Sequence, residues 1–249
     1  MITTSVRAAV ALALLSTATA TAAGPVVEVR VEGSTQTVVP PISVRADTVT
    51  AEDEMGVDRT VEGRTAFGAT VNAVDVGRGT RFSFGWSDQL GPFVTRFGQD
   101  TSVPFKGKFW QLWIDTARTP GVGYVVAQTG ARDTLLMPGD RVLWQWGKGS
   151  ETVLDVILPE GHTSGPTFVV RVVTTKANGK RSNAGGAIVE FSGKAYRADT
   201  RGRVRLPKRG SQRVPLAARR RGDVRFGQGV FALQVCGDVV CRRQLAPGA

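Results

Sequence analysis

The sequence predicts a mainly β protein made of an α+β domain followed by an antiparallel β-sandwich. Three observations lead to this prediction. Apolar residues alternate with polar ones at a period of two in many short runs. Turn residues separate such runs throughout the second half. Only one stretch has apolar residues at helical spacing, and the total of 249 residues suits two domains of roughly 100 residues each.

Residues 1–23 have the pattern of a secretory signal peptide. Arg7 supplies a positive start, an apolar run covers residues 8–15, and small residues continue to Ala23. This run is shorter than the roughly 20 residues that cross a bilayer, and no later run approaches that length. We therefore expect cleavage after Ala22 or Ala23, a secreted or extracellular protein, and a mature chain without a membrane span.

The first domain, residues 24–149, is expected to open with a hairpin. Valines alternate with Glu28, Arg30 and Glu32, so one face of its first strand is predicted to be apolar and the other polar. Thr65 stands at the N-cap position of the one expected helix. Further strands are predicted from segments that are apolar or alternate in polarity. These are residues 109–114, 124–127 and 142–146.

The second domain, residues 150–249, begins after the small polar stretch 147–150, where the charge balance changes. Its short β-prone runs predict a sandwich of antiparallel strands. These runs are residues 153–158, 168–174, 187–191, 195–198, 203–206, 212–217 and 230–236.

Positive charge is concentrated in the second domain. Residues 24–150 carry 13 Lys and Arg against 14 Asp and Glu, whereas residues 151–249 carry 18 against 7. Such an excess attracts polyanions, and export favours an acidic envelope polymer or an acidic surface protein over nucleic acid. The alternative is an arginine-rich surface that only reflects genome composition. Arg203 and Arg205 alternate with Val204 and Leu206, so a basic stripe could form on one side of a strand. The arginines expected to bind polyanions are Arg201, Arg203, Arg205, Arg219, Arg220 and Arg221.

Residue types that catalysis requires are nearly absent. His162, the single histidine, lies in a glycine-rich loop without the spacing of a nucleophile elbow. One histidine and two distant cysteines do not suggest a metal site. The acidic cluster 52–54 has no aromatic neighbour to bind a sugar, so a solvated loop is the better interpretation. We therefore expect a protein without catalytic residues, metal or cofactor; a secreted hydrolase that uses carboxylates is the remaining enzyme alternative.

The two cysteines, Cys236 and Cys241, are separated by four residues at the end of the last predicted strand. An oxidising compartment favours a disulfide between them, which would hold the basic C-terminal tail in place. Two free thiols are the alternative.

Aromatic residues of the first domain are the candidate ligand contacts, because rings on one sheet face can stack on sugars or flat ligands. Packing in the core is the alternative for each of them. Trp110 and Trp113 differ by an odd number and should point to opposite faces of a strand. The candidates are Trp110, Trp113, Tyr124, Trp144 and Trp146.

Four segments of the first domain resemble the transcobalamin-like C-terminal domain of exported bacterial proteins. They are residues 63–69, 91–98, 108–115 and 138–144. The resemblance covers roughly residues 26–147 and implies a β-grasp-like fold, a sheet with one helix packed on it. In transcobalamin-like proteins this domain covers one face of a corrinoid and a large helical domain, which this chain lacks, covers the other. Residues 198–206 are similar to immunoglobulin-like or carboxypeptidase-regulatory-like β modules.

The sequence thus favours a secreted, non-catalytic binding protein. In this interpretation the basic domain holds acidic envelope or extracellular polymers by charge, and the aromatic-rich domain contacts a second ligand or partner. The alternative is a small-molecule carrier that binds a corrinoid or another flat ligand in the first domain.

Overall fold

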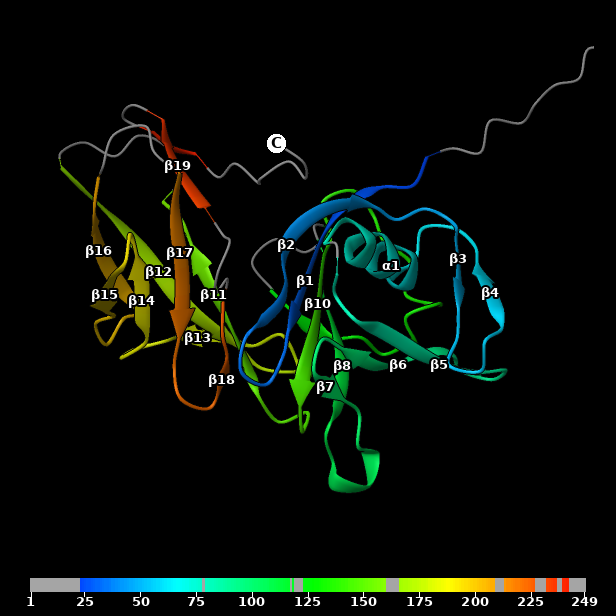
Figure 1. Ribbon diagram of the computed structural model, residues 1–249. Coiled ribbons are helices and arrows are strands. Elements are labelled where there is room, and N and C mark those ends of the chain that lie inside the picture. The colour runs from blue at the N-terminus through cyan, green and yellow to red at the C-terminus, as the bar shows by residue number, and fades with distance from the viewer. Residues whose placement is uncertain are drawn as a thin grey trace, which may run out of the picture.

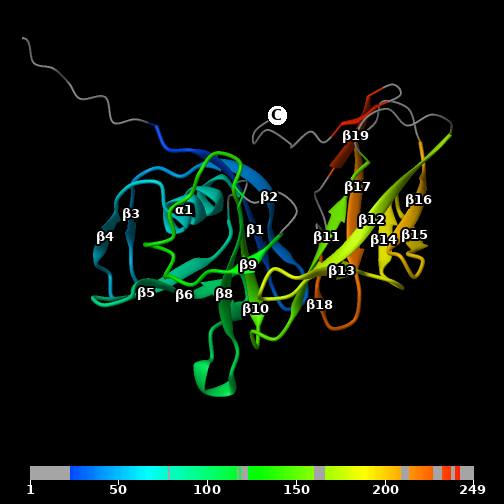
Figure 2. The ribbon, with the colours of Figure 1, turned by 180° about the vertical axis from the view of Figure 1, so that it is seen from behind.

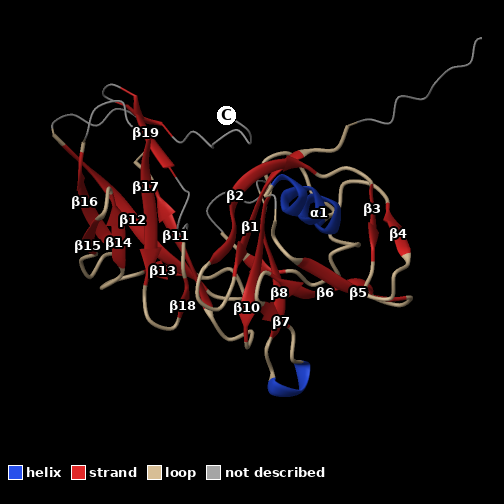
Figure 3. Cartoon of the chain, in the orientation of Figure 1, coloured by secondary structure: helices blue, strands red, loops and turns tan. Residues whose placement is uncertain are grey.

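Figure 1 shows the computed structural model of the chain, which describes residues 23–77, 79–116, 118, 123–159, 166–208, 213–226, 232–236 and 239–241. Apart from Ala23, the predicted signal peptide lies outside these residues. Within them the chain is mainly β, as the sequence predicts, with one α-helix and one short 3₁₀ helix. Figure 3 shows how strands dominate both halves.

A five-stranded mixed sheet is the centre of the first unit, residues 23–147. Its order is β2-β1-β10-β8-β9, in which β1 and β10 run parallel and the other neighbours antiparallel. The expected hairpin forms its edge, and the expected strand 109–114 lies inside it. The strands are β1 (Val26–Glu32), β2 (Thr37–Arg45), β8 (Phe109–Asp115), β9 (Val125–Val126) and β10 (Arg141–Gly147).

Helix α1 (Ala66–Val76) packs against β2, β1 and β3 (Val49–Glu52). The predicted N-cap is confirmed, because the Thr65 hydroxyl accepts a hydrogen bond of 3.1 Å from the Gly68 amide. A side chain at Gly68 would lie 2.4 Å from the Asp47 carbonyl oxygen, so this helix-weakening glycine is needed for close packing. Figures 1 and 2 show α1 on the sheet face turned away from the second half.

Smaller strands extend the first unit around the helix. β3 forms a hairpin with β4, and β5, β6 and β7 form a three-stranded sheet. The acidic cluster 52–54, predicted as a solvated loop, lies at the turn of the β3–β4 hairpin, and its Glu52 and Glu54 are exposed as expected. Asp53 is buried there and accepts hydrogen bonds from Arg59, Met55 and Val57, and the Arg59 bond chiefly lowers its pKa. The remaining elements are β4 (Asp58–Val61), β5 (Phe82–Ser87), β6 (Gly91–Phe97), β7 (Asp100–Thr101) and η1 (Pro104–Lys106).

Two five-stranded sheets build the second unit, residues 152–241. One has the order β13-β12-β11-β18 with β16 beside β12, and the other has the order β15-β14-β17-β19-β20. Their facing sides share one apolar core, which includes Phe168, Val172, Phe191 and Leu216. The strands are β11 (Thr152–Ile157), β12 (Thr167–Thr175), β13 (Arg181–Asn183), β14 (Ile188–Phe191), β15 (Lys194–Arg197), β16 (Arg203–Pro207), β17 (Arg213–Arg219), β18 (Asp223–Val224), β19 (Ala232–Cys236) and β20 (Val239–Cys241).

The polar face of the first strand is not exposed to solvent, because the second unit covers it. Glu28, Arg30 and Glu32 are 8%, 1% and 1% exposed. The Arg30 guanidinium lies between two rings, 5.5 Å from the centroid of Tyr124 and 5.2 Å from that of Phe226. The alternation thus placed the side chains on the right faces, but their charge did not indicate exposure.

Apolar and charged groups both join the two units. Trp113, Tyr124 and Leu143 of the first unit form one buried cluster with Val153 and Val224 of the second. A charged cluster lies beside it: Arg141 donates hydrogen bonds to Asp115 and, at 2.9 Å, to Asp155. The carboxylates keep the Arg141 guanidinium charged although burial opposes this, and its pKa is raised.

Candidate binding site

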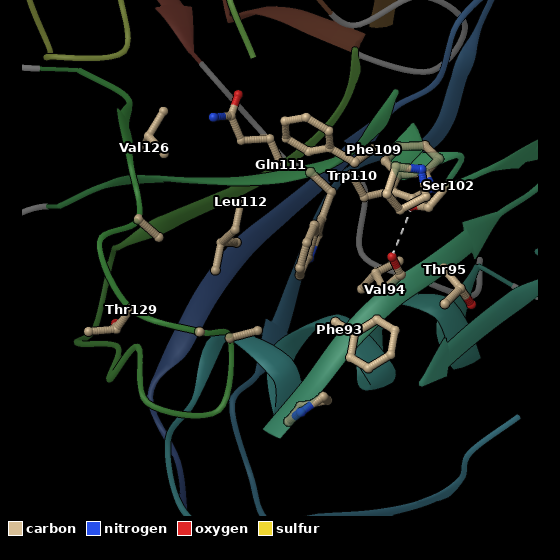
Figure 4. Close-up of a pocket in the computed structure, with 16 residues that line it drawn as sticks. Phe93, Val94, Thr95, Ser102, Phe109, Trp110, Gln111, Leu112, Val126 and Thr129 are labelled. Carbon is tan, nitrogen blue, oxygen red and sulfur yellow. Dashed lines mark hydrogen bonds between the residues drawn. The ribbon is translucent and has the colours of Figure 1, made fainter. Parts of the chain in front are cut away.

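A cleft with a volume of about 510 Å³ opens in the first unit between β6 and β8. The loop of residues 126–131 closes one side, and residues 102–104 close another. Figure 4 shows Phe93 and Val94 of β6 across the opening from Trp110 and Leu112 of β8. A space of this size falls in the range that small-molecule sites occupy.

Aromatic rings form the floor of the cleft. Trp110 and Trp144 line it, and both pack against Phe97, at 4.8 and 5.9 Å between ring centroids. The indole N–H of Trp144 donates to the Thr70 hydroxyl at 2.8 Å, and that of Trp110 donates to the Asp100 carbonyl at 3.3 Å. The polar edges of both rings therefore have partners inside the protein, and the surface offered to the cleft is apolar.

Uncharged groups, three hydroxyls and the side-chain amide of Gln111, supply the polar part of the cleft wall. Ser102 donates to the Val94 carbonyl at 3.2 Å, Thr95 donates to Glu54, and Thr129 shares a hydrogen bond of 2.9 Å with Thr134. Each hydroxyl oxygen can still accept a hydrogen bond from a ligand. The described lining contains no charged residue. The cleft therefore suits an uncharged, mainly apolar group.

The predicted aromatic residues separate into two groups. Trp110 and Trp144 line the cleft, and Trp146 packs on Trp110 at 5.3 Å between centroids. Trp113, fully buried, lies on the opposite face, as the odd spacing predicts, and donates to the Gln145 side chain at 3.1 Å. Tyr124 is buried beside it, where burial raises the pKa of its phenol to about 12. Trp113 and Tyr124 thus contact the junction of the two units, not the cleft.

A basic surface covers the outer side of β12 and β16. Arg171 and Arg203 are register partners on these neighbouring strands, and Arg205 lies opposite Val169. All three arginines are exposed, and Arg203 forms an ion pair of 2.9 Å with Asp199. Among the described residues, Arg171 and Arg205 have no acidic partner. We call these three arginines the β12–β16 basic face.

The arginines predicted to bind polyanions are divided between two sheets and the turns beside them. Arg219 lies on β17 of the other sheet, where it pairs with Glu190 at 3.0 Å. Arg220 pairs with Asp223, and Arg221 is exposed in the turn before β18. Arg201 is exposed in the turn that precedes β16. Only the members at 201–205 therefore share a region, and the six arginines do not lie on one sheet.

Some site residues were missed at the level of sequence. Arg171 alternates with Val170 and Val172 on a predicted strand, so its exposure could have been found from the period of two. Phe93, Thr95 and Thr129 carried no such signal, because the approach of β6 to β8 brings residues distant in sequence together.

Several predicted features fall outside the described part of the chain. They are His162 and the side chains of Cys236 and Cys241, so the disulfide remains a prediction. The described residues contain no group of three or more His, Cys, Asp or Glu that could hold a metal ion. Among them there is also no helix that is long and apolar enough to cross a membrane.

Comparison with known proteins adds no relative to this picture. No protein-family model matches the sequence, and no curated protein matches it. The transcobalamin-like and immunoglobulin-like resemblances therefore depend on the short segments quoted above and on the arrangement of strands.

Proposed function

We propose that the chain is an exported, non-catalytic binding protein whose cleft between β6 and β8 holds an uncharged, flat or apolar ligand. The observation that carries this proposal is the cleft itself, a space of about 510 Å³ with an aromatic floor and an uncharged lining. Burial of apolar surface supplies the affinity, and hydroxyls at the wall orient the ligand.

The finer assignment of fold is part of this proposal. A mixed sheet with one helix on one face supports a β-grasp-like first domain, residues 24–149. Two sheets around one core support an immunoglobulin-like sandwich in residues 150–249. The resemblance to transcobalamin-like domains makes a corrinoid one of the flat ligands to be tested.

The test is calorimetric titration of the mature protein with cobalamin and with a neutral polycyclic dye. Thr129 is exposed at the cleft wall, so Thr129→Phe would partly fill the cleft; Thr60→Phe makes the same change on the exposed side of β4. We expect Thr129→Phe to weaken binding at least roughly tenfold, or about 1.4 kcal/mol, and Thr60→Phe to leave it unchanged. Absence of binding by both probes, or equal binding by the two variants, would contradict the proposal.

A second function is supported by the β12–β16 basic face. Two like charges opposite each other on neighbouring strands repel, and an anionic polymer lying across Arg171, Arg203 and Arg205 relieves this repulsion. We therefore propose that the same protein associates with acidic envelope polymers through this face.

Co-sedimentation with isolated cell envelopes across a salt series tests this association. Changing Arg171, Arg203 and Arg205 together to Gln should abolish sedimentation. The matched control changes Arg219, Arg220 and Arg221 to Gln and so removes the same charge from another region. This control should retain most of the sedimentation. Binding should fade as salt rises past about 0.15 M, where the Debye length is about 8 Å. Equal loss of sedimentation in both triple variants would contradict this proposal, because the association would then depend on total positive charge and not on the β12–β16 basic face.

A further inference from the structure

Gly24, which precedes β1, has its backbone held by charged side chains on both sides. Its N–H donates to the Asp47 carboxylate at 2.6 Å, and its carbonyl accepts from the Arg45 guanidinium at 3.3 Å. The next residue is fixed too, because the Ala46 amide donates to the Pro25 carbonyl at 2.9 Å. The chain is thus anchored from its first described residues, before the sheet begins.

No side chain larger than hydrogen fits at Gly24. A Cβ there would lie 1.9 Å from the Ala46 carbonyl oxygen and 2.8 Å from the Asp47 carboxylate. The first of these neighbours is backbone, so a change of rotamer cannot relieve the clash. Gly24 is not among the residues with positive φ, so the close approach, and not a left-handed conformation, requires glycine here.

The Asp47 carboxylate is directed at this nitrogen, while the nearby Arg45 guanidinium donates to the Gly24 carbonyl instead of forming an ion pair with Asp47. Its side chain has one hydrogen-bond donor, the Gly24 N–H, and no ion pair among the described residues. The nitrogen borders a cleft of about 720 Å³ whose other sides include Thr48, Gly63 and Arg64. A positive charge on the Gly24 nitrogen would make its hydrogen bond to Asp47 a charge-assisted one. The charged group would remain in contact with solvent through the cleft.

We propose that a signal peptidase cuts between Ala23 and Gly24, and that the new α-ammonium of Gly24 pairs with Asp47. Hydrolysis adds water across this peptide bond, so that Ala23 keeps a carboxylate and Gly24 gains the ammonium. The sequence leaves junctions after Ala22 and after Ala23 open, and both have small residues before the cut. The Asp47 site favours the second junction, because only that cut places the new positive charge on the nitrogen that Asp47 binds. This inference rests on the proposed export and is independent of what either binding surface holds.

Intact-mass analysis and N-terminal sequencing of the full chain, secreted from a bacterial host, test the junction. The expected product begins at Gly24. A product that begins at Ala23 is one alanine heavier, and that result, any other start or an uncut chain would overturn the proposal.

Urea unfolding of chains with defined starts tests the pairing. The chain that begins at Gly24 should have an unfolding constant roughly threefold to tenfold lower than the chain that begins at Ala23. In the Asp47→Asn background, and after acetylation of the terminus, this difference should vanish. Its absence in the Asp47 chains, or its persistence after Asp47→Asn, would overturn the pairing. The matched control is Asp58→Asn, which changes an exposed carboxylate on β4 and should leave the difference intact.

Discussion

The two faces of the central sheet are both buried, but different interactions stabilise them. Toward α1 the sheet presents Val29, Leu112 and Trp144 to a continuous apolar core. Toward the second unit it presents Arg30 and Arg141, with carboxylates and aromatic rings around them. Burial of apolar groups tolerates small changes in geometry, whereas buried charges depend on every partner. The junction of the two units should therefore be the more fragile face.

Removal of Arg141 should have the largest effect. Arg141 donates to Asp115 and Asp155, and the Asp155 side chain is only 6% exposed. Arg141→Met keeps much of the side-chain volume but leaves two carboxylates without their main cation. We expect a loss of about 3–5 kcal/mol in the free energy of unfolding, measured by urea denaturation.

The control is the same substitution at a more exposed ion pair. Arg132 pairs with Asp133 at 3.2 Å, and their side chains are 32% and 52% exposed. Arg132→Met should therefore cost less than about 1 kcal/mol. Similar losses in the two variants would show that the charged junction is no more sensitive than the surface.

Alkaline pH should weaken the same junction through Tyr124. Burial is the main cause that raises its pKa from 10.0 to about 12, and the nearby guanidiniums of Arg141 and Arg30 only partly oppose it. The unfolded chain releases this proton first, so the contribution of Tyr124 is fully present below about pH 10 and is lost as pH rises through about 12. The loss should reach about 2–3 kcal/mol. Plots of the free energy of unfolding against pH for the wild type and Tyr124→Phe should diverge only above pH 10. Parallel plots would contradict the raised pKa of Tyr124.

Local patterns in the sequence were enough to predict the strands of the central sheet, the helix and its cap, whereas no strand was predicted for β3 to β7. The period of two gave the hairpin and the opposite orientations of Trp110 and Trp113, and Thr65 gave the start of α1. These features depend on near neighbours in the chain. The β3–β4 hairpin was missed because its acidic composition resembles a loop, and the burial of Asp53 is accompanied by bonds from Arg59, Met55 and Val57 that the composition does not reveal.

The candidate sites were predictable only in part, for the same reason. Trp110 and Trp144 could be chosen as aromatic residues, but the cleft exists because β6 and the loop 126–131 approach β8. The alternation in β1 predicts one polar face, but the burial of its charged residues depends on a unit more than 100 residues later in the chain. No local pattern carries that information.

A buried polar contact on the apolar face of the sheet makes a useful comparison. The buried Thr70 hydroxyl accepts from the Trp144 indole at 2.8 Å and donates to the Ala66 carbonyl at 2.6 Å. Thr70→Val keeps the shape and leaves the indole N–H without an acceptor. We expect a cost of about 1–3 kcal/mol by thermal or urea unfolding. Thr60→Val, at an exposed position, should change stability by less than about 0.5 kcal/mol. If Thr70→Val is as mild, the apolar core alone stabilises this face.

The smallest effect is expected on the outer surface of the second unit. Arg203 pairs with Asp199, but both side chains are about half exposed, at 53% and 42%, and Arg171 lies directly opposite Arg203. Loss of the ion pair and relief of the repulsion oppose each other, so Arg203→Ala should change the free energy of unfolding by less than about 0.5 kcal/mol. Asp199→Ala should cost more than Arg203→Ala, because Asp199 also accepts the backbone N–H groups of Arg201 and Arg203 and so shapes the turn before β16. If Arg203→Ala proved as costly as Arg141→Met, exposure would not be what separates the two charged regions, and the ion pair itself would be the dominant contribution at both.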